Sequence, residues 1–254
     1  MPQHVEIRNS LLQMLDDEDL RQVASRLRFE VLPRGTVLQK PGAPTRHLHF
    51  LDDGFATVVT DVEGITVDTA FIGFEGMIGD AFLHGVADPR TTTTMQVDGR
   101  GWRLAVEDYV FLDGLVPDLR ESMLLFSHTL TTQIMHSVLA ATRFKVRNRI
   151  ARCLLMCQDR ITSETLPITH LSLSNMLGVR RASVTNELQK LEGENLIKSK
   201  RAAVVFIDRP GLIDVADGCY GGPETEYMRV FRRWADTLSG AGDVGSDPKT
   251  LKAR

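Results

Sequence analysis

Residues 166–208 constrain the fold more than any other part of the sequence. Thr169 precedes the run HLSLSNML and can cap a short helix, Gly178 can supply the left-handed residue that ends it, and a second helical run, ASVTNELQKLEGEN, follows at once. The apolar residues that would lock these two helices together are Leu173, Leu177, Val179, Val184, Leu188 and Leu191. This spacing predicts a helix-turn-helix.

The next segment, LIKSKRAAVVFID, indicates a strand, a basic turn and a second strand, so we expect a winged helix. Lys198, Lys200 and Arg201 would lie at or near the wing, where they can meet DNA phosphates. The outer face of the second helix would carry Arg180, Arg181, Ala182, Ser183, Thr185, Asn186 and Gln189. A helical hairpin in an enzyme would show the same two helical runs, but it would not explain the wing.

The distribution of charge separates this region from the rest of the chain. Residues 143–201 contain 12 Lys and Arg against five acidic residues, a net charge of +7, whereas residues 1–120 contain 11 against 19, a net charge of −8. A basic segment beside an acidic one indicates a polyanionic partner for the first and a different role for the second. A solvated basic face is the alternative that charge alone leaves open.

Between Phe29 and Val106, short runs of Val, Leu, Phe, Thr and Ile recur every eight to twelve residues and are broken by Gly and Pro, which is typical of an all-β roll or barrel. Residues 118–142 contain no Gly or Pro and predict one long helix. The expected fold class is therefore α+β. It comprises a β-roll over residues 1–117, a central helix over 118–143, a winged helix-turn-helix over 144–220, and a carboxy-terminal helix and disordered tail over 221–254.

The apolar positions of the central helix repeat at intervals of three and four residues, which would give a single seam along it. The seam consists of Leu119, Met123, Phe126, Leu130, Ile134, Val138 and Ala141. We expect Met123, Phe126, Leu130, Ile134 and Val138 to form the interface of a homodimer. A helix that packs within one protomer is the alternative.

Several classes of protein can be set aside. In this chain of 254 residues, of which 25% are charged, no stretch approaches the roughly 20 apolar residues that a membrane helix requires. The first residues lack the basic-then-apolar order of a signal peptide, and Cys153, Cys157 and Cys219 are too few for a disulfide framework, so a cytoplasmic protein without a membrane partner is expected. No catalytic motif is present, and His47 and His49 have no evident partners for a metal site.

The order of these elements resembles the Crp-Fnr superfamily of bacterial transcription regulators over about residues 8–235. The resemblance is strongest in MLGVRRASVTNELQKLEGENLI, RIARCLLM, DRPGLIDVADGCY and GTVLQKPGAPTRHLHFLDDG. It implies a cyclic-nucleotide-binding-like β-roll, a dimerising central helix and a winged helix that binds a palindromic operator, with RNA polymerase as a further partner.

In such a regulator, Thr169, Ser172, Lys200 and Arg201 would contact phosphates, and Arg181, Ala182, Thr185 and Asn186 would face base edges. The family often has Arg-Glu-Thr-Val-x-Arg at this helix, whereas this chain has Arg-Ala-Ser-Val-Thr-Asn from Arg181 to Asn186. The acidic residue and the second arginine are missing. The operator sequences known for the family therefore do not transfer. A ligand-binding or protein-interaction module that has lost operator specificity is the alternative.

The cyclic-nucleotide binders of the family carry Gly-Glu for the ribose and Arg-Ser/Thr for the cyclic phosphate. Gly79-Asp80 and Arg90-Thr91 stand at the matching positions, with Thr131 as a candidate for the base. Apolar Ile134 and Met135 replace two hydroxyl side chains expected at the base. A cyclic nucleotide thus remains one hypothesis for the effector, beside a degenerate pocket that binds another ligand or none.

The tail begins with GGPETEYMRVFRRWADTL, which predicts an amphipathic helix bearing Tyr227, Phe231 and Trp234. We expect its aromatic face to pack on the body of the protein, with RNA polymerase or a partner subunit as alternatives. The end of the tail is expected to be disordered.

Overall fold

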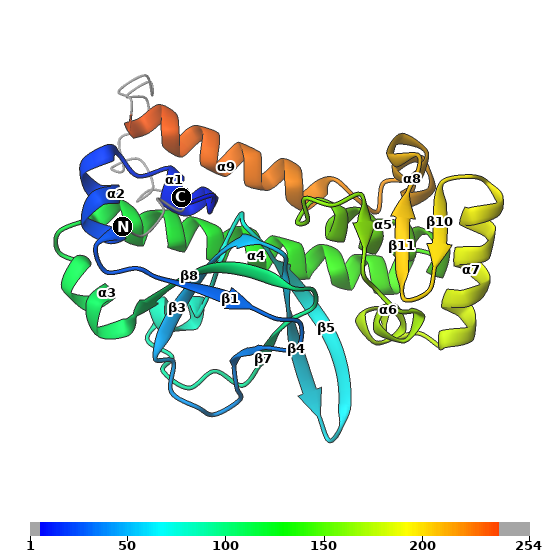
Figure 1. Ribbon diagram of the computed structural model, residues 1–254, viewed down its shortest axis with the longest axis horizontal. Helices are drawn as coiled ribbons and strands as arrows, with labels where there is room; N and C mark the ends of the chain where they lie inside the picture. Colours follow the sequence, from blue (N-terminus) through cyan, green and yellow to red (C-terminus); the bar gives the residue numbers. More distant parts are fainter. Residues whose placement is uncertain (1–5, 239–254) are drawn as a thin grey trace, which may run out of the picture.

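The computed structural model describes residues 6–238 and has the predicted α+β architecture (Figure 1). The first part of the chain forms α1 (Ser10–Gln13), α2 (Asp17–Ala24), β1 (Arg28–Leu32), β2 (Val37–Gln39), β3 (His47–Asp53), β4 (Ala56–Val62), β5 (Ile65–Ile72), β6 (Met77–Ile78), the 3-10 helix η1 (Asp80–His84), β7 (Thr92–Met95), β8 (Gly99–Ala105) and α3 (Val106–Leu112). The second part forms α4 (Pro117–Arg143), α5 (Val146–Gln158), β9 (Thr165–Leu166), α6 (His170–Leu177), α7 (Arg181–Gly193), β10 (Ile197–Lys200), β11 (Ala203–Phe206), α8 (Arg209–Ala216) and α9 (Gly222–Leu238).

The strands of the first part form two antiparallel four-stranded sheets, in the orders β1-β8-β3-β6 and β2-β7-β4-β5, which we call the β-roll. Leu48, Phe50 and Leu104 are fully buried in its core. Gly101 pairs with Leu51 across β8 and β3, where a Cβ atom would lie 2.3 Å from the Phe50 carbonyl oxygen. Only glycine fits this close approach of two strands, so the register of the roll depends on it.

Helix α4 confirms the long helix expected over residues 118–142 and begins with Pro117 at its first turn, where proline is favoured. One face of α4 is buried against the β-roll and α1. A second face of α4 is covered by α9, which runs antiparallel to α4 (Figure 1). Glu226 of α9 bonds His128 of α4 at 3.1 Å, and Gly222, earlier in α9, lies against His136, later in α4.

This packing corrects part of the predicted dimer interface. Met123, Phe126 and Leu130 are at most 7% exposed within a single chain, and Ile134 is half-buried against the same core. Because the roll and α9 already cover Met123, Phe126 and Leu130, these three side chains are not available to a second copy in this conformation. Of the five predicted interface residues, Val138 alone is exposed, at 59%.

The second core belongs to the winged helix-turn-helix. Helices α5, α6, α7 and α8 and the sheet β10-β11-β9 bury a continuous cluster that includes Ile150, Leu154, Leu173, Val184 and Leu212. The two helices of the predicted helix-turn-helix and both strands of the wing are present, which confirms the prediction for residues 166–208.

Helix α9 confirms the amphipathic helix predicted for the tail. Phe231 and Trp234 are 3% and 5% exposed and join the core of the roll, and Tyr227 donates from its hydroxyl to the Glu75 carbonyl oxygen at 2.9 Å. The aromatic face therefore packs on the body, as expected. The disorder predicted for the end of the tail lies outside the described residues.

Candidate nucleic-acid interface

The turn between α6 and α7 has the local geometry that the sequence predicted. The Thr169 hydroxyl caps α6 by accepting from the Ser172 amide at 3.0 Å. Gly178 ends α6 with φ of +60°, the left-handed conformation that glycine adopts without strain. Val184 and Leu188 are fully buried beneath α7. The opposite face of α7 is consequently fixed toward the outside of the molecule.

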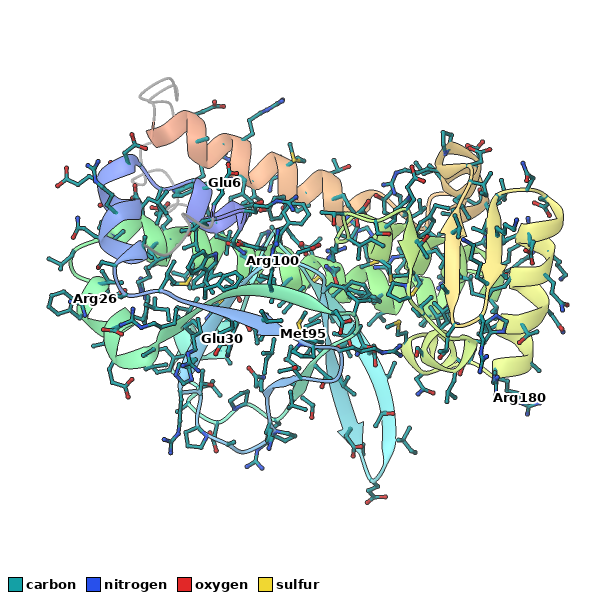
Figure 2. All side chains as sticks on the ribbon, viewed as in Figure 1. Glu6, Arg26, Glu30, Met95, Arg100 and Arg180 are labelled. Atoms are coloured by element: carbon teal, nitrogen blue, oxygen red, sulfur yellow. The ribbon has the colours of Figure 1, made fainter. Side chains whose placement is uncertain are left out.

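Most of the predicted DNA-contacting residues lie on that outer face. Arg180, Arg181, Ala182 and Asn186 are exposed, and Ser183 is half-buried. Figure 2 shows Arg180 projecting from the edge of the helix-turn-helix, away from the β-roll. None of the ion pairs among the described residues includes Arg180 or Arg181. Their guanidinium groups remain available to an anionic partner.

The basic turn of the wing lies between β10 and β11. Lys200 and Arg201 are exposed there, and Ala202 has φ of +55°, which closes the tight turn. The Ser199 amide donates to the Glu192 carboxylate at 2.9 Å, which ties the wing to the end of α7. The wing and α7 are therefore in contact, and their cations lie on the same part of the protein.

Two predicted contact residues have partners within the protein. The Thr185 hydroxyl lies 2.9 Å from the His170 ring nitrogen, which holds it against α6. The Ser172 hydroxyl accepts from the Arg34 guanidinium of the β-roll at 3.1 Å. Sequence reasoning missed both partners. For Arg34, which lies 138 residues before Ser172, no local pattern could have revealed the contact.

Among the described residues, no hydrogen bond or ion pair joins Asp80, Arg90, Thr91 and Thr131 to one another. Asp80 is turned toward α4, where its carboxylate accepts from the Ser127 hydroxyl at 3.2 Å; burial raises the pKa of Asp80, and this hydrogen bond opposes the rise. Arg90 is exposed, the Thr91 hydroxyl accepts from Gln39 at 2.9 Å, and the Thr131 hydroxyl donates to the Ser127 carbonyl of its own helix. Gly79 lines a cavity of about 190 Å³, together with His47 and His49.

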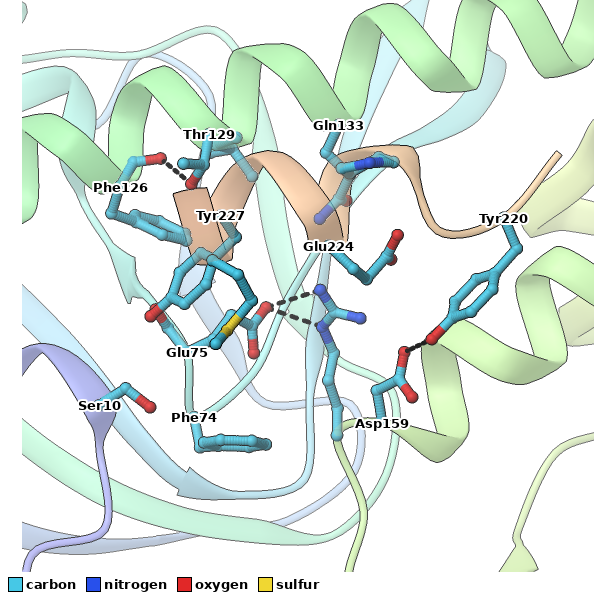
Figure 3. Close-up of a pocket in the computed structure, with 14 residues that line it drawn as sticks. Ser10, Phe74, Glu75, Phe126, Thr129, Gln133, Asp159, Tyr220, Glu224 and Tyr227 are labelled. Atoms are coloured by element: carbon cyan, nitrogen blue, oxygen red, sulfur yellow. Dashed lines mark hydrogen bonds and ion pairs between the residues drawn. The ribbon is translucent and has the colours of Figure 1, made fainter. Parts of the chain in front are cut away.

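A cavity of about 380 Å³ lies between α4, α9 and the Phe74–Glu75 loop (Figure 3). Arg160 reaches across it from the end of α5 and pairs with Glu75 at 2.7 Å. Beside this pair, Asp159 accepts from the Tyr220 hydroxyl at 2.8 Å and pairs with Arg209 at 2.6 Å. This network joins the β-roll to the helix-turn-helix region, and its charged groups are paired with one another.

Metal and thiol chemistry have little structural basis in the part of the chain described. Residues 6–238 contain no group of three or more His, Cys, Asp or Glu that could hold a metal ion. Cys153, Cys157 and Cys219 are buried, and burial raises the pKa of the Cys157 and Cys219 thiols, which disfavours the reactive thiolate. No helix in this range is long and apolar enough to cross a membrane.

Comparison with known proteins agrees with this geometry. Residues 148–215 match the family model of the Crp-like helix-turn-helix domain. No curated protein matches the chain.

Solved structures share this fold over about three quarters of the chain. A CRP-family transcriptional regulator from Thermus thermophilus is 19% identical with a TM-score of 0.64, covering 76% of this chain and 99% of the other. A CRP/FNR-family regulator of the same organism is 20% identical with a TM-score of 0.62, covering 75% and 99%. The c-di-GMP-responsive global regulator CLP of Xanthomonas campestris is 16% identical with a TM-score of 0.62, covering 76% and 99%. The chain therefore carries a Crp-like helix-turn-helix domain over residues 148–215, and it shares its fold with solved structures of Crp/Fnr-family transcription regulators.

Proposed function

We propose that the protein acts as a homodimer that binds palindromic promoter DNA through α7 and the wing. The observation that carries this proposal is the unpaired, exposed pair Arg180 and Arg181 at the start of α7, on the same unit as the exposed Lys200 and Arg201. Arginine recognises guanine edges in the major groove, whereas the cations of the wing would meet phosphates. Ala182 and Asn186 would complete the base-facing surface.

The dimer would form through a second seam on α4, adjacent to the one expected from the sequence. Thr131, Met135, Val138 and Thr142 are exposed at spacings of four, three and four residues, and Met135 and Val138 are 64% and 59% exposed. Leu139 beside them is 47% exposed. A repeat of this kind is what a two-stranded coiled coil uses, and a twofold axis along α4 would place two α7 helices about 34 Å apart on DNA.

The remaining assignments complete the proposal. Residues 1–117 would serve as an effector-like domain, 118–143 as the dimerisation helix and 144–220 as the DNA-binding domain, in a cytoplasmic protein that acts with RNA polymerase. Because no hydrogen bond or ion pair among the described residues joins Asp80, Arg90 and Thr131, strict dependence on a cyclic nucleotide is not part of the proposal.

Operator binding by two variants tests the DNA contacts. On an operator selected by the wild-type protein, Lys200→Ala should weaken binding to every sequence and lower the slope of log affinity against log salt by about 1. Arg181→Ala should cost about 1 to 3 kcal/mol and relax preference at one base pair of each half-site. Fluorescence anisotropy over a salt series measures both, with Lys40→Ala in the β-roll as the matched control. Equal losses for all sequences in both variants would contradict the assignment of α7 as the recognition helix.

A further inference from the structure

Arg152 on α5 is a buried cation without a counterion. Arg152 is 6% exposed, and its Nε atom has no hydrogen-bond partner among the described residues. Its one hydrogen bond among the described residues runs from Nη2 to the Ser137 hydroxyl at 3.3 Å, and it takes part in none of the ion pairs in that range. A buried guanidinium in this state is costly, because an unpaired charge loses its hydration without gaining an opposite charge.

Arg152 lines a cavity of about 260 Å³ that is distinct from the one in Figure 3. The cavity lies where β5, the end of α4, α5 and α6 meet, and its walls are mostly apolar, with Phe71, Ile134, Ala141 and Met176 among them. Arg149 lines the same cavity and donates to the Leu177 carbonyl oxygen. Two cations thus face a cavity whose walls are otherwise mostly apolar, with Asp68, Thr69, Ser137 and Thr142 as the polar exceptions.

The charge balance of this cavity favours an anion. Asp68 is the one carboxylate in its lining, and none of the ion pairs among the described residues joins it to Arg149 or Arg152. Glu224 influences Arg152 electrostatically but does not form an ion pair with it. The larger cavity differs, because Arg160 there is paired with Glu75 and Asp159 with Arg209. In the smaller cavity, by contrast, none of the ion pairs among the described residues includes Arg149 or Arg152.

We propose that the cavity between β5, α4, α5 and α6 binds a small monocarboxylate with an apolar body, its carboxylate held by Arg152 and Arg149. An apolar cavity of about 150 Å³ suffices to bind benzene, so this one can hold a single aromatic ring or a short alkyl chain together with a carboxylate. Arginine suits the role because its guanidinium can bind both oxygens of a carboxylate. Cyclic nucleotides are larger than a single ring with a carboxylate and carry a polar base, which walls that are mostly apolar accommodate poorly.

The position of the cavity would let such a ligand affect how the β-roll and the helix-turn-helix are placed relative to each other. Its walls include Val67 on β5 and Leu177 at the end of α6, so a bound molecule would contact both the β-roll and the helix-turn-helix. This consequence rests on the proposed operator binding, whereas the ligand site itself does not. A ligand that fits one relative placement of the two parts better than another would shift the population of that placement.

Calorimetric titration of the full chain without DNA tests the site. The probes are phenylacetate, its neutral counterpart 2-phenylethanol and its cationic counterpart 2-phenylethylamine, with wild type, Arg152→Met and the exposed control Arg143→Met. We expect saturable binding of phenylacetate to wild type and to the control, and binding at least tenfold weaker for the two other probes.

Arg152→Met should weaken phenylacetate binding at least tenfold while leaving the melting temperature unchanged or higher, because methionine removes the unpaired buried charge. Absence of saturable binding to wild type, equal affinity for the Arg152→Met variant, or equal affinity for the neutral probe would overturn the inference. The titration contains no DNA, so a failure of operator binding leaves its result intact, and the two proposals can fail separately.

Discussion

The buried ion pair between Arg160 and Glu75 gives the sharpest stability prediction. The side chains of Arg160 and Glu75 are 7% and 16% exposed, and the carboxylate accepts from two guanidinium nitrogens at 2.7 and 2.8 Å. A third nitrogen donates to the Met156 carbonyl at 2.8 Å. The pair links the loop after β5 to the end of α5. Glu75→Ala would leave the guanidinium buried with a backbone carbonyl as its remaining direct partner.

Removing one partner of a buried ion pair costs about 3 to 5 kcal/mol, because the remaining charge is uncompensated. In a chain of this size each kcal/mol corresponds to a change of about 2 to 4 °C in melting temperature. We therefore expect Glu75→Ala to lower the melting temperature by about 6 to 20 °C. The double variant Glu75→Leu/Arg160→Met should recover most of this loss, since it buries no charge.

Differential scanning calorimetry at neutral pH measures these changes. The matched control is Asp108→Ala, which removes an ion pair of comparable length, 2.6 Å, between side chains that are 34% and 36% exposed. A partly exposed pair of this kind contributes about 0 to 1 kcal/mol. If Glu75→Ala lowered the melting temperature no more than Asp108→Ala, the reasoning from burial would be refuted.

Two further predictions concern assembly and pH. Met135→Glu should convert the dimer to monomers in light scattering after size exclusion, whereas Val31→Glu, at a position that is 72% exposed on the roll, should not; a dimeric Met135→Glu protein would exclude the exposed seam of α4. Burial, with His47 and Arg103 nearby, lowers the pKa of His49 to about 4, so the folded state binds this proton less readily than the unfolded state. Stability should therefore fall as pH drops from about 6.5 to about 4, by up to about 3 kcal/mol, in urea titrations. His49→Gln should remove that part of the acid sensitivity, and an unchanged pH dependence would contradict the burial argument.

The helix-turn-helix could be predicted almost residue by residue because its signals are local. A capping Thr169, a left-handed Gly178 and apolar positions at helical spacing determine both helices without reference to the rest of the chain. The absence of Gly and Pro from residues 118–142 is an equally local signal. The predicted bounds of this helix agree with those of α4 to within one residue.

The dimer interface predicted on α4 shows what the apolar periodicity of a helix cannot determine. The periodicity assigned Met123, Phe126 and Leu130 to a dimer interface; they share one buried face, but a pattern cannot tell which element buries it. The β-roll and α9 do so, and the exposed seam through Met135 shares Val138 with the predicted seam and is otherwise displaced by one residue along the helix. The weaker apolar content of that seam, with two threonines, made it inconspicuous in the sequence.

Contacts distant in sequence account for the other differences. Asp80 occupies the position expected from the resemblance, and its carboxylate accepts a hydrogen bond from Ser127 on α4, a partner 47 residues away in the sequence. The unpaired state of Arg152 depends on which carboxylates the fold fails to bring near it. Neither fact follows from spacing along the chain.

Selection of bound DNA from a random duplex pool by the purified protein, with no nucleotide added, tests the central claim most directly. The two α7 helices of a dimer through α4 predict a twofold-symmetric motif with half-sites about one helical turn apart, enriched in guanine where Arg181 faces a base. Recovery of unrelated sequences, with and without added cyclic nucleotides or phenylacetate, would contradict the account of this protein as a sequence-specific regulator.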